Sequence, residues 1–319
     1  MKLVVSNLEA LSTYVSREFY YTMRDLISIH RWRHLETGEL FARSGSLSDK
    51  LFAELGELPE IILFWESYEL MVKHAADIHR LDCRKFVVAD DLHWFDDRAR
   101  QMKSVGFALA DAVLATYGYR WDHFYPQFCN TKRVVWIPHA ASPDFIVPYN
   151  PQPQNFVLLS GAMTGHYPLR QQLKALHERG SYAIVYQPHP GYYTGYDYQT
   201  DEYIGSGFAR TLNSYRAAFT DSLVYRYVVA KYFEIPATGA LLLADEAVSG
   251  PLSQLGFIKH QHYVPVSKEN LEEQIQFVLD EKNHEELDQI RRAGQDLVWQ
   301  KHRTSDRARQ IDEACSLNN

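Results

Sequence analysis

The sequence predicts an α/β protein built from two doubly wound units. Short apolar runs alternate with helix-length amphipathic stretches along the whole chain, a rhythm typical of parallel sheets covered by helices. A stretch with four prolines, SPDFIVPYNPQPQN at 142–155, interrupts this rhythm. Proline fixes the backbone and removes a hydrogen-bond donor, so the stretch is interpreted as a linker. The 319 residues also suit two domains of roughly 150 residues each.

The apolar runs define the expected strands, because each is closed by polar residues and is too short for a typical helix. We expect domains at 1–148 and 149–300, then a helix at 301–319 that can cross back to the first domain. The predicted strands are 2–6, 60–66, 84–91, 111–117 and 132–139 in the first domain, and 156–161, 182–188, 217–221, 239–245 and 262–266 in the second; helices are predicted at 70–81, 98–109 and through 269–314.

Composition narrows the class of protein. No apolar run approaches the roughly 18 residues needed to cross a bilayer. The three cysteines, Cys83, Cys129 and Cys315, are widely spaced and indicate a reducing compartment, so we expect a cytoplasmic protein. A net charge of −7 argues against a dedicated nucleic-acid binder, whose phosphate contacts need concentrated Lys and Arg.

Chemically useful residues collect where predicted strands of the second domain end, the usual ligand edge of an open α/β sheet. Gly161 ends one strand, and the next helix, expected from Pro168, carries Arg170; such a turn offers free backbone N–H groups to an anion. Asp221 and Ser222 are of helix-capping types, and we expect the helix after them to hold Arg226 and Lys231. These cations suit a diphosphate, although solvated surface charges are the simpler alternative.

The segment KYFEIPATGALLLAD at 231–245 resembles the donor-binding segment of GT-B glycosyltransferases, in particular the family 1/4-like, spore-maturation-type group. That superfamily carries an E-x7-E pattern whose second Glu precedes a Gly step into a strand, and Glu234, Thr238 and Gly239 match this half without a gap. The stretches VVWIPHAASPDF (134–145), SGAMTGHYPLR (160–170) and IRRAGQDLVWQKHRTSDRA (290–308) are also similar to the family, whereas residues before about 85 are not.

The resemblance implies a GT-B fold, with two Rossmann-like domains facing a cleft and a C-terminal closing helix. It also implies transfer of a hexose or deoxyhexose from a nucleotide sugar, a UDP- or GDP-sugar, to a hydroxyl of a glycan or other glycoconjugate. Glu234 would then accept hydrogen bonds from the ribose hydroxyls, which suits a carboxylate; the alternative is a Glu that merely stabilises a helix. The expected donor-binding residues are Gly161, Arg170, His189, Arg226, Lys231, Glu234, Thr238 and Gly239.

The sequence departs from the family pattern eight positions before Glu234, where Arg226 replaces the first Glu. In retaining members that Glu contacts the donor sugar. An Arg there can instead neutralise the charge of the leaving phosphate. The donor sugar and the stereochemical outcome therefore stay open.

A base for the acceptor hydroxyl is expected at the end of the strand at 84–91, from Asp91, His93 or Asp90. Helix capping by the acids and packing of His93 are the alternatives, and Asp96 and Asp97 are expected to start the next helix. The sequence contains no H-E-x-x-H and no D-x-D, so we expect a metal-independent enzyme without a cofactor. Two other functions stay open, a nucleotide-sugar epimerase or hydrolase and a non-catalytic nucleotide-sugar-binding module.

Overall fold

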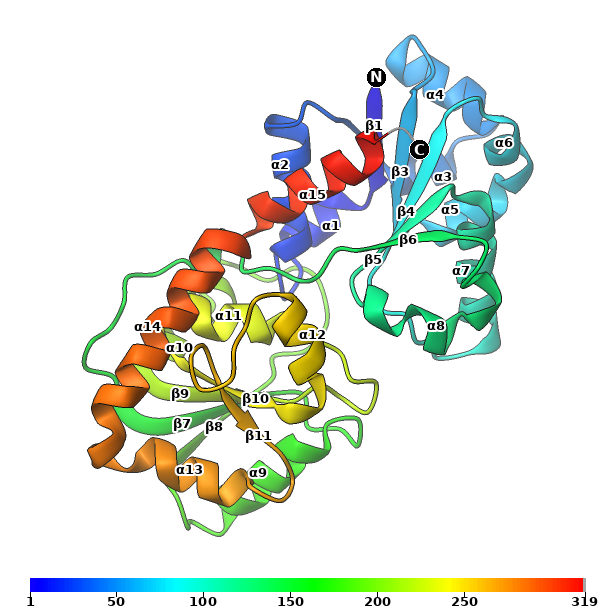
Figure 1. Ribbon diagram of the computed structural model, residues 1–319. Coiled ribbons are helices and arrows are strands. Elements are labelled where there is room, and N and C mark those ends of the chain that lie inside the picture. Colours follow the sequence, from blue (N-terminus) through cyan, green and yellow to red (C-terminus); the bar gives the residue numbers. More distant parts are fainter. Residues whose placement is uncertain (318–319) are drawn as a thin grey trace. The chain divides into compact units, whose positions relative to one another are not determined.

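The computed structural model describes residues 1–317, which form two compact units (Figure 1). The first unit contains Met1–Ser12, Tyr20–Pro138 and the residues from Arg307 onward, and the second contains Thr13–Phe19 and His139–Asp306. Each unit has a parallel sheet with helices, as the sequence predicts. No helix among the described residues is long and apolar enough to cross a membrane.

The sheet of the first unit is parallel throughout, in the order β2-β1-β3-β4-β5-β6. All five strands expected here are confirmed. The sixth, β2, was not predicted: its sequence RHLE is polar and lies at the sheet edge, so it lacks the apolar run of a buried strand. The strands are β1 (Lys2–Ser6), β2 (Arg33–Glu36), β3 (Ile61–Trp65), β4 (Arg84–Ala89), β5 (Ala112–Ala115) and β6 (Arg133–Trp136).

One helix of the first unit differs from the prediction. The expected helix at 70–81 is two helices, α5 and α6, which meet at His74, where the backbone leaves helical angles (φ −112°, ψ 25°). Side chains hold this break, because Lys50 Nζ and Asp77 Oδ2 both contact the imidazole of His74. The helices are α1 (Leu8–Ser12), α2 (Glu18–Ser28), α3 (Thr37–Ala42), α4 (Leu47–Leu55), α5 (Tyr68–Lys73), α6 (Ala75–Arg80), α7 (Asp97–Leu109), α8 (Trp121–Phe124) and α15 (Thr304–Ser316).

The sheet of the second unit is also parallel, in the order β11-β10-β9-β7-β8. All of its strands were predicted, because each centres on a buried apolar run. The strands are β7 (Gln154–Gly161), β8 (Ile184–Pro188), β9 (Tyr215–Thr220), β10 (Leu241–Asp245) and β11 (Val264–Val266).

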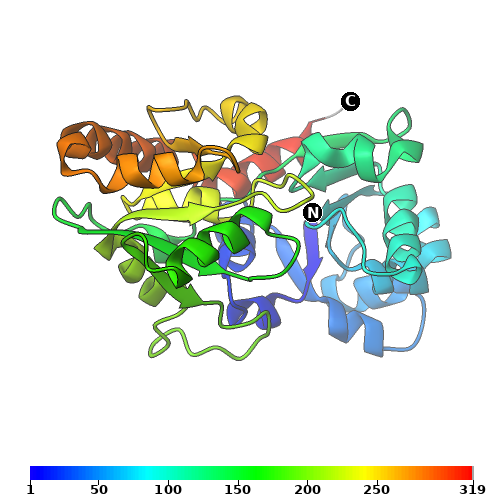
Figure 2. The ribbon, with the colours of Figure 1, turned by 90° about the horizontal axis from the view of Figure 1, so that it is seen from below.

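Helices cover both faces of this second sheet, as both views show (Figures 1 and 2). One face packs on α9 (Pro168–Glu178) and α13 (Leu271–Leu279) in a single apolar core. The other face packs on α10 (Gly205–Ser214) and α11 (Lys231–Ala237), while α14 (His284–Lys301) packs on α11 and β10 and adds Leu287 and Ile290 to the first core. The short α12 (Ser249–Gln254) follows β10. The expected helical tail is therefore α13, α14 and α15 in succession.

The strand order reverses direction at β7. From β7 the chain crosses to β8 on one side, whereas β9, β10 and β11 continue on the other side. The helices α9 and α11, which follow β7 and β9, therefore lie on opposite faces of the sheet. Ligands of such sheets bind beyond the carboxyl ends of the strands at this reversal point, so the ends of β7 and β9 identify the region to inspect.

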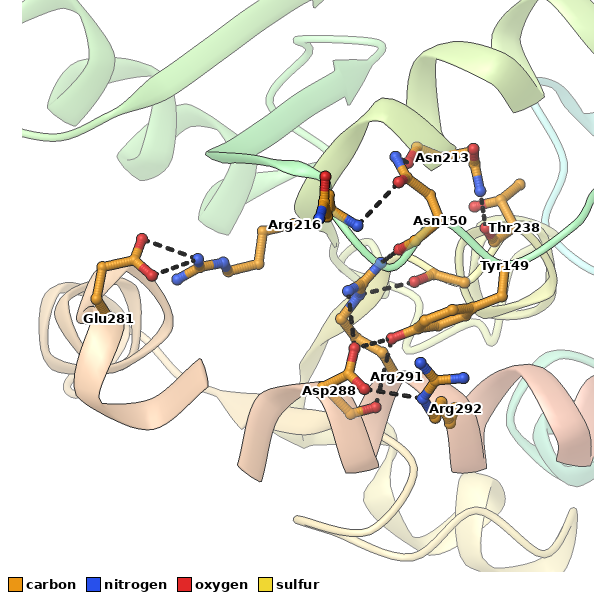
Figure 3. Close-up of polar contacts among 11 residues, drawn as sticks. Tyr149, Asn150, Asn213, Arg216, Thr238, Glu281, Asp288, Arg291 and Arg292 are labelled. Carbon is orange, nitrogen blue, oxygen red and sulfur yellow. Dashed lines mark hydrogen bonds and ion pairs between the residues drawn. The ribbon is translucent and has the colours of Figure 1, made fainter. Parts of the chain in front are cut away.

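A buried polar network fixes the far end of α11 (Figure 3). Gly239 ends the helix with φ +77°, and a Cβ there would lie 2.9 Å from the Tyr149 ring. Arg291, on α14, donates to the carbonyl oxygens of Gly239 (2.9 Å) and Asn150 (2.8 Å). The C-terminal end of α11 is thereby held against the linker and α14.

Candidate functional site

The turn after β7 brings together three of the residues predicted from the sequence. Gly161 has φ +108°, which favours glycine. A Cβ at this position would lie 2.5 Å from Arg170 Nη1 and 3.5 Å from Lys231 Cε. Because Gly161 has no side chain, Arg170 of α9 and Lys231, the first residue of α11, can both lie against the turn.

Arg170 joins the ends of β7 and β9. Its Nε lies 3.1 Å from Asp221 Oδ1, and its other nitrogens donate to Thr220 Oγ1 (3.1 Å) and to the carbonyl oxygen of Ala162 (3.3 Å). The side chain is almost wholly buried. Burial raises the pKa of Asp221 to about 6, and the charge of Arg170 opposes the rise. Arg170 therefore shapes the turn and also supplies a fixed positive charge beside it.

Lys231 and Glu234 supply the charges of α11. The Lys231 ammonium lies 4.2 Å from the centre of the Phe208 ring, and burial lowers its pKa to about 8. Glu234 is 6% exposed, and burial raises the pKa of its carboxyl to about 7, with the charge of Lys231 acting in the opposite direction. Within residues 1–317, no hydrogen bond reaches either charged group. A buried carboxylate without donors is costly, and hydroxyl groups of a ligand can supply them.

His189, after β8, lies near the same cations. Its Nδ1 accepts a hydrogen bond from the backbone N–H of Gly191 (2.9 Å), and its ring packs on Tyr192 with ring centres 4.3 Å apart. Burial, together with the charges of Lys231 and Arg170, lowers the pKa of His189 to about 4. The imidazole is therefore neutral at physiological pH.

The segment after β9 corrects one prediction. Asp221 and Ser222 do not cap a helix, because residues 221–230 form turns and α11 begins only at Lys231. Their side chains have other partners: Asp221 pairs with Arg170, and Ser222 Oγ donates to Asp245 Oδ2 (2.5 Å). Because the side chains of Asp221 and Ser222 bind residues far away in the sequence, they do not cap a helix. The sequence gives no sign of these distant partners.

Arg226 accordingly lies in a turn, not on a helix. It is exposed and has φ +57°, and Leu223 in the same turn has φ +58°. Arg226 also lines a cavity of about 380 Å³ with Ser222 and Asp245, at the carboxyl ends of β9, β10 and β11. Two non-glycine residues with left-handed backbone in one short turn indicate strain held by the surrounding fold. The expected contact of Arg226 with a donor stays a prediction.

Thr238 and Gly239 lie at the opposite end of α11 from Lys231. Thr238 is fully buried, and its Oγ1 donates to the carbonyl oxygen of Ile235 (2.8 Å). Its own carbonyl accepts from Asn213 Nδ2 (2.7 Å), beside the Arg291 network (Figure 3). Both residues thus have a clear role in ending the helix, while their expected donor contact stays a prediction.

In the first unit, Asp90, Asp91 and His93 follow β4. Asp91 Oδ1 lies 3.6 Å from His93 Nδ1, and Lys103 Nζ donates to the backbone carbonyls of both residues. The next helix begins as expected, because Asp96 caps α7 by accepting from the N–H of Ala99 (2.7 Å). The acid–imidazole group therefore stands at the carboxyl edge of the first sheet.

Glu66 joins this group without having been predicted. It follows β3, and its Oε1 accepts a hydrogen bond from the backbone N–H of Asp90 (3.1 Å). Its backbone is left-handed, with φ +48°. The sequence clue was a lone acid directly after a buried strand, EIILFWE at 60–66, and the contact with Asp90 depends on the pairing of β3 with β4. Over the part of the chain that the structure describes, no group of three or more His, Cys, Asp or Glu side chains could hold a metal ion.

Comparisons with known proteins agree with this architecture. Residues 166–313 match the model of a family described as glycosyl transferase-like. This match contains α9, α11 and α14, and with them Arg170, Lys231 and Glu234. No curated protein sequence matches the chain.

Three solved structures are similar over nearly the whole chain. A sucrose-phosphate synthase from Thermosynechococcus elongatus has a TM-score of 0.63 at 11% identity, covering 98% of each chain. An alpha-glucosyltransferase in complex with UDP-glucose and DNA containing an abasic site has a TM-score of 0.64 at 10% identity, covering 99% of this chain and 98% of that one. HepE from Anabaena, in complex with UDP-glucose, has a TM-score of 0.63 at 10% identity, covering 99% of each. Structural similarity at these TM-scores, with so low a sequence identity, establishes the fold alone. The chain therefore has the GT-B fold of these structures, and its residues 166–313 match the family described as glycosyl transferase-like.

Proposed function

We propose that the protein transfers a sugar from a nucleotide-sugar donor to a hydroxyl of a carbohydrate or glycoconjugate acceptor, without a metal ion or cofactor. UDP- and GDP-sugars are the donors we expect. UDP-glucose is supported by its presence in two of the similar structures. The second unit would bind the donor, and the first unit the acceptor.

The observation that carries this proposal is the state of Glu234. Its carboxylate is buried without a hydrogen bond from the described residues, one helical turn from Lys231 and beyond the strand reversal. The fold thus leaves two carboxyl oxygens without a hydrogen-bond donor from the described residues at the edge where ligands bind. Two ribose hydroxyls can satisfy both oxygens at once.

The neighbouring cations suit the other half of the donor. Lys231, beside the glycine turn at Gly161 and the fixed guanidinium of Arg170, would contact the diphosphate. Bond cleavage leaves negative charge on the nucleoside diphosphate, and positive groups already in place stabilise that charge as it develops. Neutral His189 adds hydrogen bonding without adding charge.

The acceptor hydroxyl must lose a proton during transfer. Asp91, His93 and Asp90 stay our candidates for the base, because they stand at the carboxyl edge of the first sheet. Glu66 extends this group of acids. Arg226 stands where the family pattern has its first Glu. Whether the transfer inverts or retains the configuration of the sugar is therefore left to experiment.

Incubation of the full chain with UDP-, GDP- and dTDP-sugars tests the proposal. Slow release of free nucleoside diphosphate, with water as a poor acceptor, is the expected result and would identify the donor. An isomerised sugar still attached to its nucleotide would replace transfer by epimerisation. Tight binding without turnover in the presence of glycan acceptors would indicate a binding module. Because one similar structure holds DNA, duplex DNA belongs among the acceptors tested, and its glucosylation would overturn our expectation of a carbohydrate acceptor.

A further inference from the structure

Phe95 is an exposed aromatic residue close to the candidate base. It lies two residues after His93 and is 91% exposed. Its ring meets the imidazole of His93 in a T-shaped contact, with ring centres 5.4 Å apart and ring planes at 79°. A single exposed apolar side chain is common on protein surfaces. The surroundings of Phe95 therefore decide whether its ring has a function.

A groove lies between two helices of the same unit. Its volume is about 480 Å³, within the range of about 300 to 1,000 Å³ that is usual for small-molecule pockets. Helices α5 and α7 lie side by side and form its walls (Figure 1). We call it the α5–α7 groove. Its lining includes Glu69 and Val72 of α5, Arg98, Gln101 and Val105 of α7, and Phe41 of α3.

One end of this groove lies at the sheet edge that carries the candidate base. Helix α5 follows β3 and α7 follows β4, and these strands are parallel neighbours, so both helices begin at the carboxyl edge. Glu69 and Arg98 belong to the first turns of the two helices, and an ion pair (3.7 Å) joins them there. Asp91 and Phe95 stand just before α7. The candidate base, the Phe95 ring and the mouth of the groove therefore occur along one edge.

The groove combines apolar side chains with side chains that can change their hydrogen-bond partners. Phe41 and Val72 are partly exposed. Glu69 and Arg98 are both exposed, so their ion pair contributes little to stability and can be exchanged for contacts with a ligand. Gln101 adds an amide, which both donates and accepts. A sugar chain suits this mixture, because it has apolar C–H surfaces for aromatic rings and many hydroxyl groups.

The charges nearby argue against an acceptor that carries phosphate groups. The segment 91–97 contains three aspartates and no lysine or arginine. Both cations of the groove already have partners: Arg98 pairs with Glu69, and the Lys73 ammonium lies over the Phe41 ring and donates to the carbonyl oxygen of Phe41. Phosphate contacts need concentrated positive charge, whereas a neutral sugar does not.

We propose that the α5–α7 groove and the Phe95 ring form the acceptor site, and that the acceptor is a neutral oligosaccharide. Its terminal sugar packs on Phe95 beside the candidate base, and the sugars before it lie in the groove. This inference deepens the proposed function and rests on it. A hydroxyl oxygen of the terminal sugar bonds to the anomeric carbon of the donor sugar, the bond from that carbon to the nucleoside diphosphate breaks, and the hydroxyl proton passes to the base.

Binding of the fluorescently labelled full chain to a glycan array in the presence of UDP tests the proposal. We expect neutral glycans of two or more sugars to be retained, and monosaccharides to bind more weakly. Phe95→Ala should weaken binding of the retained glycans by about tenfold, since a stacked ring is lost. Phe52→Ala removes another exposed phenylalanine of the same unit, on α4, and should bind as the wild type does.

A second variant blocks the groove without changing the Phe95 ring. Gln101 is exposed and lines the groove, so Gln101→Trp places an indole inside it. We expect binding of the longer glycans to fall by about tenfold or more, and binding of monosaccharides to stay unchanged. Ala108→Trp is the matched control, because Ala108 is an exposed residue two turns further along α7 and is not part of the lining.

The outcomes separate this inference from the proposed function. Unchanged glycan binding in folded Phe95→Ala and Gln101→Trp overturns the site. A wild type that releases UDP from UDP-glucose but retains no glycan, or retains only glycans that carry phosphate, also overturns the inference and leaves the proposed function intact. Loss of a dimer in Phe95→Ala, seen by sedimentation, would assign the ring to a contact between copies. If the wild type binds none of the UDP-, GDP- and dTDP-sugars, the proposed function fails, and the inference fails with it.

Discussion

The charged groups of Lys231 and Glu234 interact electrostatically across the first turn of α11, and burial moves their pKa values toward each other. The pKa of the ammonium falls to about 8, and that of the carboxyl rises to about 7. Near neutrality the pair can therefore exist with both charges or with neither. In the proposed function the nucleotide sugar would use both charges, the cation for its diphosphate and the carboxylate for its hydroxyls.

The first prediction is an affinity optimum for UDP-glucose between pH about 7 and about 8. Below this range Glu234 is protonated and stops accepting from two hydroxyls, and above it Lys231 loses its charge. The diphosphate of UDP-glucose keeps its charge across this range, so a change of affinity with pH must come from groups of the protein. Calorimetry across the neutral range checks it. Glu234→Gln should lose the acidic limb and keep the basic one, and a flat wild-type profile would contradict the idea.

The second prediction separates stability from binding. A carboxyl whose pKa is raised from 4.5 to about 7 by folding destabilises the native state increasingly as pH rises through that interval. Glu234→Gln should therefore raise the melting temperature above neutral pH, while weakening UDP-glucose binding by about tenfold or more. Glu285→Gln, at an exposed position of α14, should change neither. A lower melting temperature in Glu234→Gln would show that the carboxylate is stabilising.

The third prediction concerns the turn after β7. Gly161→Ala places a methyl group 2.5 Å from Arg170 Nη1, in a backbone conformation that disfavours alanine. The guanidinium must move, so we expect UDP-glucose affinity to fall by about tenfold, with a stability loss of about 1 to 3 kcal/mol. Gly165→Ala is a close control, because no atom lies within 4 Å of the added Cβ. Equal affinities in both variants would remove Gly161 from the site.

Much of the fold could be predicted because buried strands appear in the sequence as short apolar runs. The apolar core of KLVVS and the run ALLLA show this pattern, and their alternation with helices indicates parallel sheets from the sequence alone. The edge strand β2 was missed for the same reason, since RHLE is half exposed and lacks an apolar run. The turn at 221–230 was missed because the side chains of Asp221 and Ser222 are satisfied by residues far away in sequence.

The candidate site was predictable only in part. The convergence of Gly161, Arg170 and Lys231 follows from their position after parallel strands that end at one edge. In contrast, no spacing rule joins Glu66 to Asp90 until the register of β3 and β4 is known.

The fourth prediction addresses the acceptor side. Asp91→Asn removes the charge next to His93 but keeps the size of the side chain. If Asp91 is the base or orients it, turnover should fall by about a hundredfold or more, while donor affinity stays near normal. Asp82→Asn, a change at an acid outside this group, should retain full turnover. Full activity in Asp91→Asn would leave His93, Asp90 and Glu66 to be tested in the same assay.

The last prediction is structural and concerns the network that ends α11 (Figure 3). Arg291 is 2% exposed at its side chain and donates to the carbonyl oxygens of Gly239 and Asn150, whereas Arg292, its neighbour, is 53% exposed. Arg291→Met leaves the buried carbonyl of Gly239 and the partly buried carbonyl of Asn150 without a donor, so we expect unfolding by urea to show a loss of about 2 to 4 kcal/mol. Arg292→Met breaks an ion pair with Asp288 and a contact with the Tyr149 ring, both made by an exposed side chain, and should cost about 0.5 kcal/mol.

The two arginine variants also test whether α11 is held from its far end. Loss of the Gly239 contact frees the C-terminal turn of a seven-residue helix whose first turn carries Lys231 and Glu234. UDP-glucose affinity should therefore fall in Arg291→Met at temperatures where the variant is still folded, and stay unchanged in Arg292→Met. A destabilised Arg291→Met with normal affinity would show that the network supports the fold without positioning the charged pair.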